Sequence, residues 1–123
     1  AAGEGFLEIV QYLVAAAGGH FEIVKYLVGE RTASVDVVNI GGETALYLAA
    51  ANGHFDIVKY LAGERSASVD VVDKSGNTPL HGAAAGGHFE IVKYLVGERT
   101  ASVDVVNIGG ETALYLAAAN GHF

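Results

Sequence analysis

The chain contains no cysteine, methionine or tryptophan, and one proline, in 123 residues. Without cysteine it can form neither a disulfide nor a thiolate metal site, so we expect a cytoplasmic or nuclear setting. Lys and Arg number 7 against 14 Asp and Glu, and we expect no nucleic-acid partner because phosphate binding needs clustered basic residues. The apolar residues occur in runs shorter than the roughly 18 that a membrane span needs, so we expect no membrane insertion.

An internal repeat dominates what is present. Gly-His-Phe recurs at His20, His54, His88 and His122 with a constant period of 34 residues. A longer period lies on top of it, because residues 15–55 are identical to residues 83–123. The chain is therefore an array of short units that alternate between two types, and units this small must stack on one another to bury a core.

Each unit contains signals for two helices and a turn. Thr78 is suited to a helix N-cap and Pro79 to the first helical position. After the glycines that end this helix, Phe89, Val92 and Val96 share one face of a second, amphipathic helix. The run 103–106 has β-branched character and leads to a turn tip at 107–110. The order is helix, helix, extended hairpin.

The motif Gly76-Asn-Thr78-Pro79-Leu80-His81-Gly-Ala-Ala, followed by Gly87-His88, resembles the ankyrin repeat. The tetratricopeptide repeat shares the period of 34 but uses a Trp-Leu-Gly-Tyr pattern that is absent here. The resemblance implies an all-α repeat solenoid, an ankyrin-type stack of helix-turn-helix units with short β-hairpin connections.

Two features depart from that family. The usual ankyrin period is 33, and we predict that the extra residue lies in the connection Gly-Glu-Arg-Thr-Ala-Ser-Val-Asp-Val-Val. In the other repeat type, Thr44-Ala45-Leu46-Tyr47 replaces Thr-Pro-Leu-His. Those turns should be looser or differently bonded, because they lack the imidazole that the family uses to tie the turn to the Thr hydroxyl.

The repeat boundaries follow from the period. We expect one array over 1–123, with a partial repeat at 15–38, repeats at 39–72 and 73–106, and a partial repeat at 107–123. We interpret residues 1–14 as an isolated second helix. Phe6 to Val14 matches the second-helix pattern, and the next copy of this pattern follows after 14 residues, not after the full period of 34. We therefore predict a break between Val14 and Ala15. Both ends lack the polar capping repeats of soluble solenoids, so we interpret the chain as a piece of a longer array.

No motif for catalysis, a cofactor or a metal stands out. The Gly-His histidines lie one repeat apart, about 8–10 Å, too far to share a zinc ion, and we expect each to bond loop backbone. A set of Ser75, His81 and Asp73 would have no oxyanion hole or pocket. The helix-preceding glycines lack a Gly-x-x-x-x-Gly-Lys pattern. We expect a non-enzymatic protein.

The resemblance implies a protein–protein interaction scaffold that binds through hairpin tips and the concave face of the first helices. The positions implied are Ile40, Gly41, Glu43, Tyr47, Lys74, Ser75, Asn77, Ile108, Gly109, Glu111 and Tyr115. Ile40 and Ile108 are candidate anchors for a protein partner, unless they fold back on the next hairpin. Two alternatives stay open: a spacer or self-assembling segment, with end-to-end association, and an engineered scaffold without a native partner.

Overall fold

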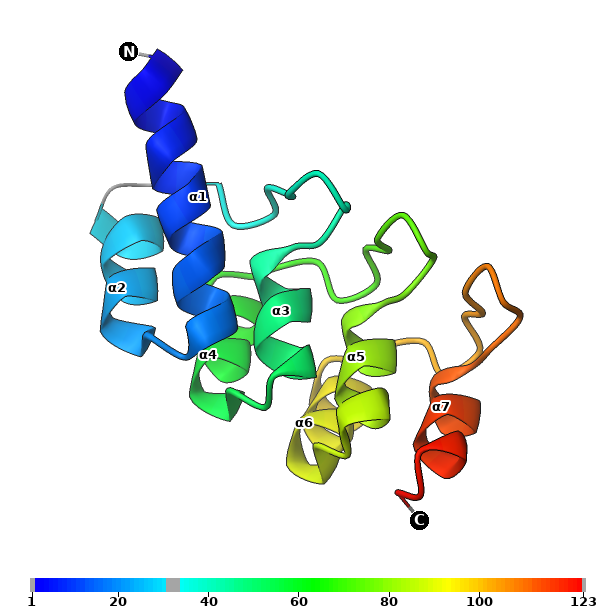
Figure 1. Ribbon diagram of the computed structural model, residues 1–123. Coiled ribbons are helices and arrows are strands. Elements are labelled where there is room, and N and C mark those ends of the chain that lie inside the picture. Colours follow the sequence, from blue (N-terminus) through cyan, green and yellow to red (C-terminus); the bar gives the residue numbers. More distant parts are fainter. Residues whose placement is uncertain (1, 31–33, 123) are drawn as a thin grey trace.

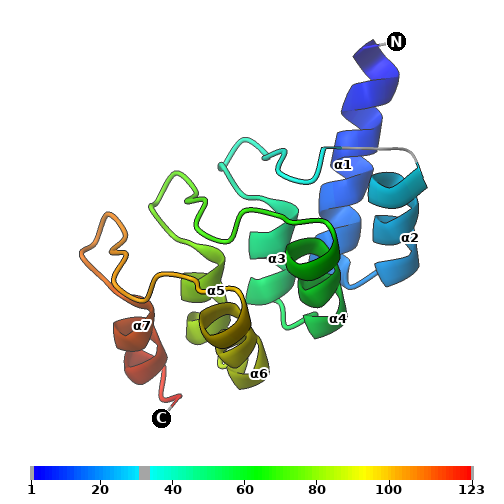
Figure 2. The same ribbon diagram turned by 180° about the vertical axis from the view of Figure 1, so that it is seen from behind.

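The computed structural model describes residues 2–30 and 34–122, with side chains from residue 7 onward. The chain forms a row of helix pairs joined by long connections that project to one side (Figure 1; Figure 2). The elements are α1 (Ala2–Gly18), α2 (Phe21–Lys25), η1 (Tyr26–Glu30), α3 (Ala45–Ala51), α4 (Phe55–Lys59), η2 (Tyr60–Glu64), α5 (Pro79–Gly86), α6 (Phe89–Lys93), η3 (Tyr94–Glu98) and α7 (Ala113–Ala119). Within the described residues no helix is both long enough and apolar enough to cross a membrane.

The first helices begin at threonine caps, as predicted. Thr78 caps α5 by accepting a hydrogen bond from the His81 amide, and Pro79 occupies the first helical turn. Thr44 and Thr112 cap α3 and α7 in the same way. Helix α5 ends at Gly86 and is capped by Gly87, whose left-handed backbone (φ 76°) suits glycine. Local sequence therefore sets where these helices begin and where α5 ends.

The second helices each end in a wide π-helical turn. In η3 the Arg99 amide bonds the Tyr94 carbonyl at 3.2 Å, five residues back, and in η2 Arg65 bonds Tyr60 in the same way at 3.0 Å. A π-turn holds one residue more than an α-turn, so it accommodates the residue by which this period exceeds 33. The turn includes Gly97 and Glu98 of the predicted connection but begins three residues earlier.

A continuous apolar core runs along the stack. Leu46 and Leu80 on the first helices are 1% and 2% exposed, and Ile57 and Leu61 on the second helices are fully buried. The contacts α1·α3, α3·α5 and α5·α7 link the first helices, and α2·α4 and α4·α6 link the second helices. The ankyrin-type all-α stack expected from the repeat is thus confirmed.

The connections contain less β-structure than expected. The described residues form one isolated bridge, between Val38 and Thr44, and the run 103–106 is not a strand. The two arms of a hairpin meet at the tip, where Asn39 and Glu43 share a backbone hydrogen bond of 3.1 Å. Val35, Val37 and Val69 instead pack against the helical core. Residues 31–33 of the first connection lie outside the described residues.

The predicted interruption between Val14 and Ala15 is wrong as a statement about the backbone. Both residues lie inside α1, which is uninterrupted over Ala2–Gly18. The segment 2–18 contains no proline, and the alanines that follow Val14 are the strongest helix formers, so the two sequence types join in one helix. Tyr12 takes the place of Leu46 and Leu80 in the stack and is fully buried. Residues 2–14 are therefore part of one helix with residues 15–18 and do not form an isolated second helix.

Candidate functional site

The hairpin tips are built on side chains that bond their own turns. The Asn39 Oδ1 atom accepts hydrogen bonds from the amides of Gly41 and Glu43 at 2.9 and 3.0 Å. Asp73 does the same for Ser75 and Asn77, at 2.9 Å each. Such Asx turns fix a short loop in one conformation. The tips are thus preset by local chemistry.

Backbone hydrogen bonds also join neighbouring tips. The Lys74 amide donates to the Gly41 carbonyl at 3.0 Å, and the Ile108 amide donates to the Ser75 carbonyl at 2.9 Å. The Asn107 side-chain amide bridges the Asn77 and Glu111 side chains at 2.9 Å each. The three tips therefore form one connected edge along the array (Figure 1).

Two isoleucines stand out on this edge. Ile40 is 93% exposed and Ile108 81% exposed, so neither side chain folds back on a neighbouring hairpin. Between them lies the tip with Lys74 and Ser75, both exposed. Glu43, Asn77 and Glu111 are half-buried because hydrogen bonds hold them at the base of the tips. Gly41 is half-buried and Gly109 exposed.

The histidines bond carbonyls in other repeats. The Nε2 atoms of His54 and His88 lie 3.0 and 3.1 Å from the carbonyls of Ala17 and Ala51, and His122 repeats the contact 3.2 Å from Ala85. These three histidines therefore bond backbone, as predicted, but the acceptor carbonyls lie near the ends of α1, α3 and α5 and not in loops. They hold each repeat to the one before it.

The comparisons with known proteins fit this geometry. Two family models match, both described as ankyrin repeats: one of many copies over residues 12–62, and one of 3 copies over residues 65–123. The chain belongs to the ankyrin repeat family. No curated protein matches it significantly. Ankyrin repeats are generally protein–protein interaction modules and are typically not enzymes.

The two tyrosines of the predicted surface differ although their repeats are identical in sequence. On α3 of the ankyrin array, Tyr47 is half-buried, and a Cβ atom added at Gly82 would lie 3.0 Å from its ring. Burial raises the pKa of Tyr47, and the Asp73 and Glu43 carboxylates raise it further. Tyr115, at the same position of α7, is 56% exposed. Tyr115 therefore offers far more contact surface.

The bonding of the two repeat types also differs, as predicted. In the ankyrin array's Thr-Pro-Leu-His repeat, His81 Nδ1 accepts from the Thr78 amide at 3.1 Å and Nε2 reaches the Glu111 carbonyl at 2.9 Å. In the other type, an Asn side chain bonds the Glu at the base of its tip at 2.9 Å, as Asn39 does with Glu43. The sequence analysis missed these Asn residues. The spacing Asn-x-Gly-Gly-Glu, typical of an Asx turn, is the signal that could have found them.

Proposed function

We propose that this ankyrin array recognises a protein partner through its hairpin tips and the concave face of its first helices. The observation that supports it is the pair of isoleucines, exposed by 93% and 81%, on tips held in one conformation. An exposed apolar side chain on a preset loop loses little conformational entropy when it binds, so it contributes more of its contact energy to affinity.

Charge defines the kind of partner. The chain has a net charge of −7, and Glu43, Asp73 and Glu111 lie at the bases of the three tips, with Lys74 at the middle tip. A partner segment with apolar side chains flanked by Lys or Arg is complementary to this pattern, and complementary charge raises association rates and selects among partners.

The repeated tip adds a spacing requirement. Ile40-Gly-Gly-Glu43 and Ile108-Gly-Gly-Glu111 are identical and lie two repeats apart. At about 8–10 Å per stacked repeat, the two isoleucines are roughly 20 Å apart. A partner that offers two apolar anchors at this spacing engages both tips together and gains avidity.

The test compares capture from source-cell lysate by the parent and by a tip variant with Ile40→Ser, Glu43→Lys, Lys74→Glu, Ile108→Ser and Glu111→Lys. A control variant carries Lys59→Glu and Glu90→Lys, both exposed on the second helices. Proteins that parent and control capture and the tip variant loses are purified, and their binding is measured by calorimetry. Equal affinity for parent and tip variant would contradict the proposal.

A further inference from the structure

The connections between the helix pairs expose apolar side chains below their tips. The described part of the first connection alternates between exposed and half-buried residues, and the half-buried Val35 and Val37 pack against the helical core. Side chains two residues apart in an extended backbone share a side. Asp36, Val38 and Ile40, which alternate with the packed valines, therefore project away from the core.

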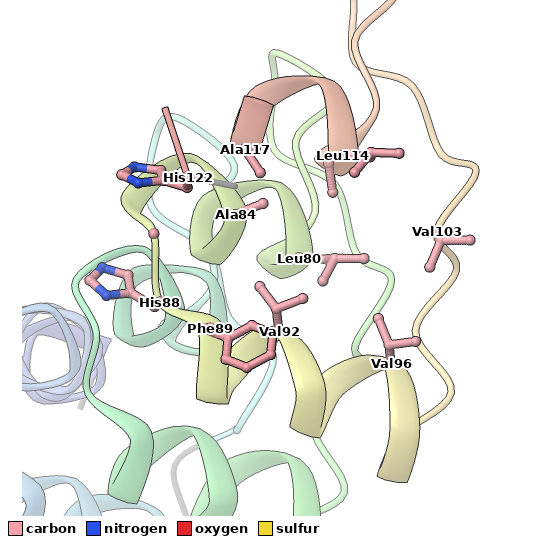
Figure 3. Close-up of a pocket in the computed structure, with 12 residues that line it drawn as sticks. Leu80, Ala84, His88, Phe89, Val92, Val96, Val103, Leu114, Ala117 and His122 are labelled. Carbon is pink, nitrogen blue, oxygen red and sulfur yellow. The ribbon is translucent and has the colours of Figure 1, made fainter. Parts of the chain in front are cut away.

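The other two connections repeat this pattern. In the second, the exposed Asp70 and Val72 alternate with half-buried residues. In the third, Val103 lines a pocket of about 620 Å³ between α5, α6 and α7 (Figure 3), so the side that faces the helices is the side of Val103, and Asp104 and Val106 are exposed on the other. We call the exposed set the valine face and define it by Asp36, Val38, Asp70, Val72, Asp104 and Val106.

Hydrogen bonds align the three connections, so that the valine face forms two rows. Backbone bonds join neighbouring tips. At the base of the connections, the Ser68 amide donates to Asp36 Oδ1 and the Ser102 amide donates to Asp70 Oδ1, at 3.2 Å each. The valines lie between these two points of contact along the chain. The three valines therefore stand side by side in one row, and the three aspartates form a second row beside it.

The exposure of the valine row does not depend on the position in the stack. Val38 and Val72 are each 46% exposed, and Val106 is 54% exposed. The middle connection, which has a neighbour on both sides, thus exposes its valine as much as the first one does. A row of apolar side chains that packing between repeats leaves uncovered is typical of a protein interaction site.

The spacing of the row selects among the conformations of a bound segment. Neighbouring valines are one stacked repeat apart, about 8–10 Å. A polyproline II helix returns to the same side after three residues, or about 9 Å. A β-strand returns after two residues, or about 7 Å, and an α-helix needs seven residues and about 10.5 Å. The row therefore matches a polyproline II segment with an apolar side chain at every third residue.

The aspartate row specifies the residue next to each apolar one. The chain has a net charge of −7, and the three aspartates of the row are exposed. Successive side chains of a polyproline II helix point about 120° apart. A segment whose apolar side chains lie on the valines therefore directs the neighbouring residues toward the aspartates, where Lys or Arg is complementary in charge.

We propose that the valine face binds a polyproline II segment of a protein partner, with the repeating pattern apolar–basic–proline and one triplet for each repeat of the array. The inference rests on the proposed function and adds the conformation and the period of the partner. Proline-rich segments hold this conformation before they bind, so they lose little entropy on binding.

The probe is an end-capped, fluorescein-labelled peptide of four Leu-Lys-Pro triplets, titrated with the 123-residue chain and followed by fluorescence anisotropy. We expect a Kd below about 1 mM. Three matched peptides should each bind about fivefold more weakly or worse. Leu-Lys-Gly triplets lack the restriction that proline imposes, Leu-Glu-Pro triplets reverse the charge, and an α-helical peptide carries Leu-Lys at the start of three heptads.

Variants of the array locate the site. Val72→Lys, in the middle of the valine row, should weaken binding about fivefold or more. The control is Ile23→Lys on α2, which makes the same change at a side chain 49% exposed and should bind like the parent. Asp70→Asn keeps an oxygen for the Ser102 amide but removes the charge, so it should weaken binding and reduce its salt dependence. Circular dichroism should be unchanged in all three variants.

Absence of binding by the Leu-Lys-Pro peptide would overturn the inference, and so would tighter binding of the helical peptide or equal losses in folded Val72→Lys and Ile23→Lys. The proposed function is tested separately, by the partner captured from lysate. If the tip variant loses that partner while the triplet peptide does not bind the parent, recognition through the tips stands and the valine face is not the site.

Discussion

Replacing His81 tests how much the alternation of the two repeat types contributes to stability. The side chain is 1% exposed. Nδ1 accepts from the Thr78 amide at 3.1 Å, which requires that Nδ1 carry no proton, so Nε2 holds the proton and donates to the Glu111 carbonyl at 2.9 Å. One imidazole thus caps its own helix and joins it to the next repeat.

The magnitude follows from the groups that His81→Ala leaves without a partner. The Thr78 amide belongs to a residue 1% exposed, and a buried unsatisfied donor costs about 1–3 kcal/mol. The half-buried Glu111 carbonyl, which water reaches more easily, adds about 1 kcal/mol. We expect the free energy of unfolding to fall by roughly 2–4 kcal/mol, measured by urea unfolding with circular dichroism at 222 nm.

Tyr115→Ala is the matched control, because Tyr115 holds the same position in the next repeat and is 56% exposed. It should cost less than about 1 kcal/mol. Hydrogen exchange adds a local readout: in His81→Ala the amides of Ala113–Ala119 should exchange faster, because Glu111, just before α7, loses its hydrogen bond to α5. If His81→Ala costs no more than Tyr115→Ala, the argument from the buried hydrogen bonds is refuted.

Three further changes probe the stack by the same unfolding measurement. Burial raises the pKa of Tyr12 in the folded chain above its usual value of 10.0. The stabilisation is therefore complete below pH 10 and falls at higher pH, where the unfolded chain loses the tyrosine proton first. Tyr12→Phe should reduce this alkaline loss of stability, at a cost of about 1 kcal/mol for the hydrogen bond to the Val35 carbonyl. Thr100 has a left-handed backbone (φ 54°), so Thr100→Gly should stabilise by about 0.5–1 kcal/mol while the control Ser102→Gly does not. Phe55→Leu removes the edge-to-face contact with Tyr94 and should cost about 0.5–1.5 kcal/mol more than Phe89→Leu, whose ring is 66% exposed; equal losses would contradict this reading.

Local signals predicted the helices well because they act within one repeat. Thr78, Pro79 and Gly87 each set a helix boundary through their own backbone chemistry, and no distant contact is needed. The π-turns, and the lack of strands in the described part of the connections, escaped prediction for the opposite reason. A valine run favours a strand by composition, but Val37 and Val69 face the core here, and only the packing of neighbouring repeats decides that.

The position of a repeat in the stack is a second property that the repeat sequence alone does not predict. Residues 15–55 and 83–123 are identical in sequence, yet Tyr47 is half-buried and Tyr115 exposed, and Ala50 is fully buried while its copy Ala118 is exposed. The difference lies in the neighbouring repeat, because α5 packs beside Tyr47 whereas no described helix follows α7. A surface predicted from the sequence of one repeat is therefore the same for each identical copy, although the exposure of the side chains differs between the copies. Tyr47 and Tyr115 show this most clearly, because the two residues have the same sequence neighbours and differ in exposure only through the repeat that packs against Tyr47.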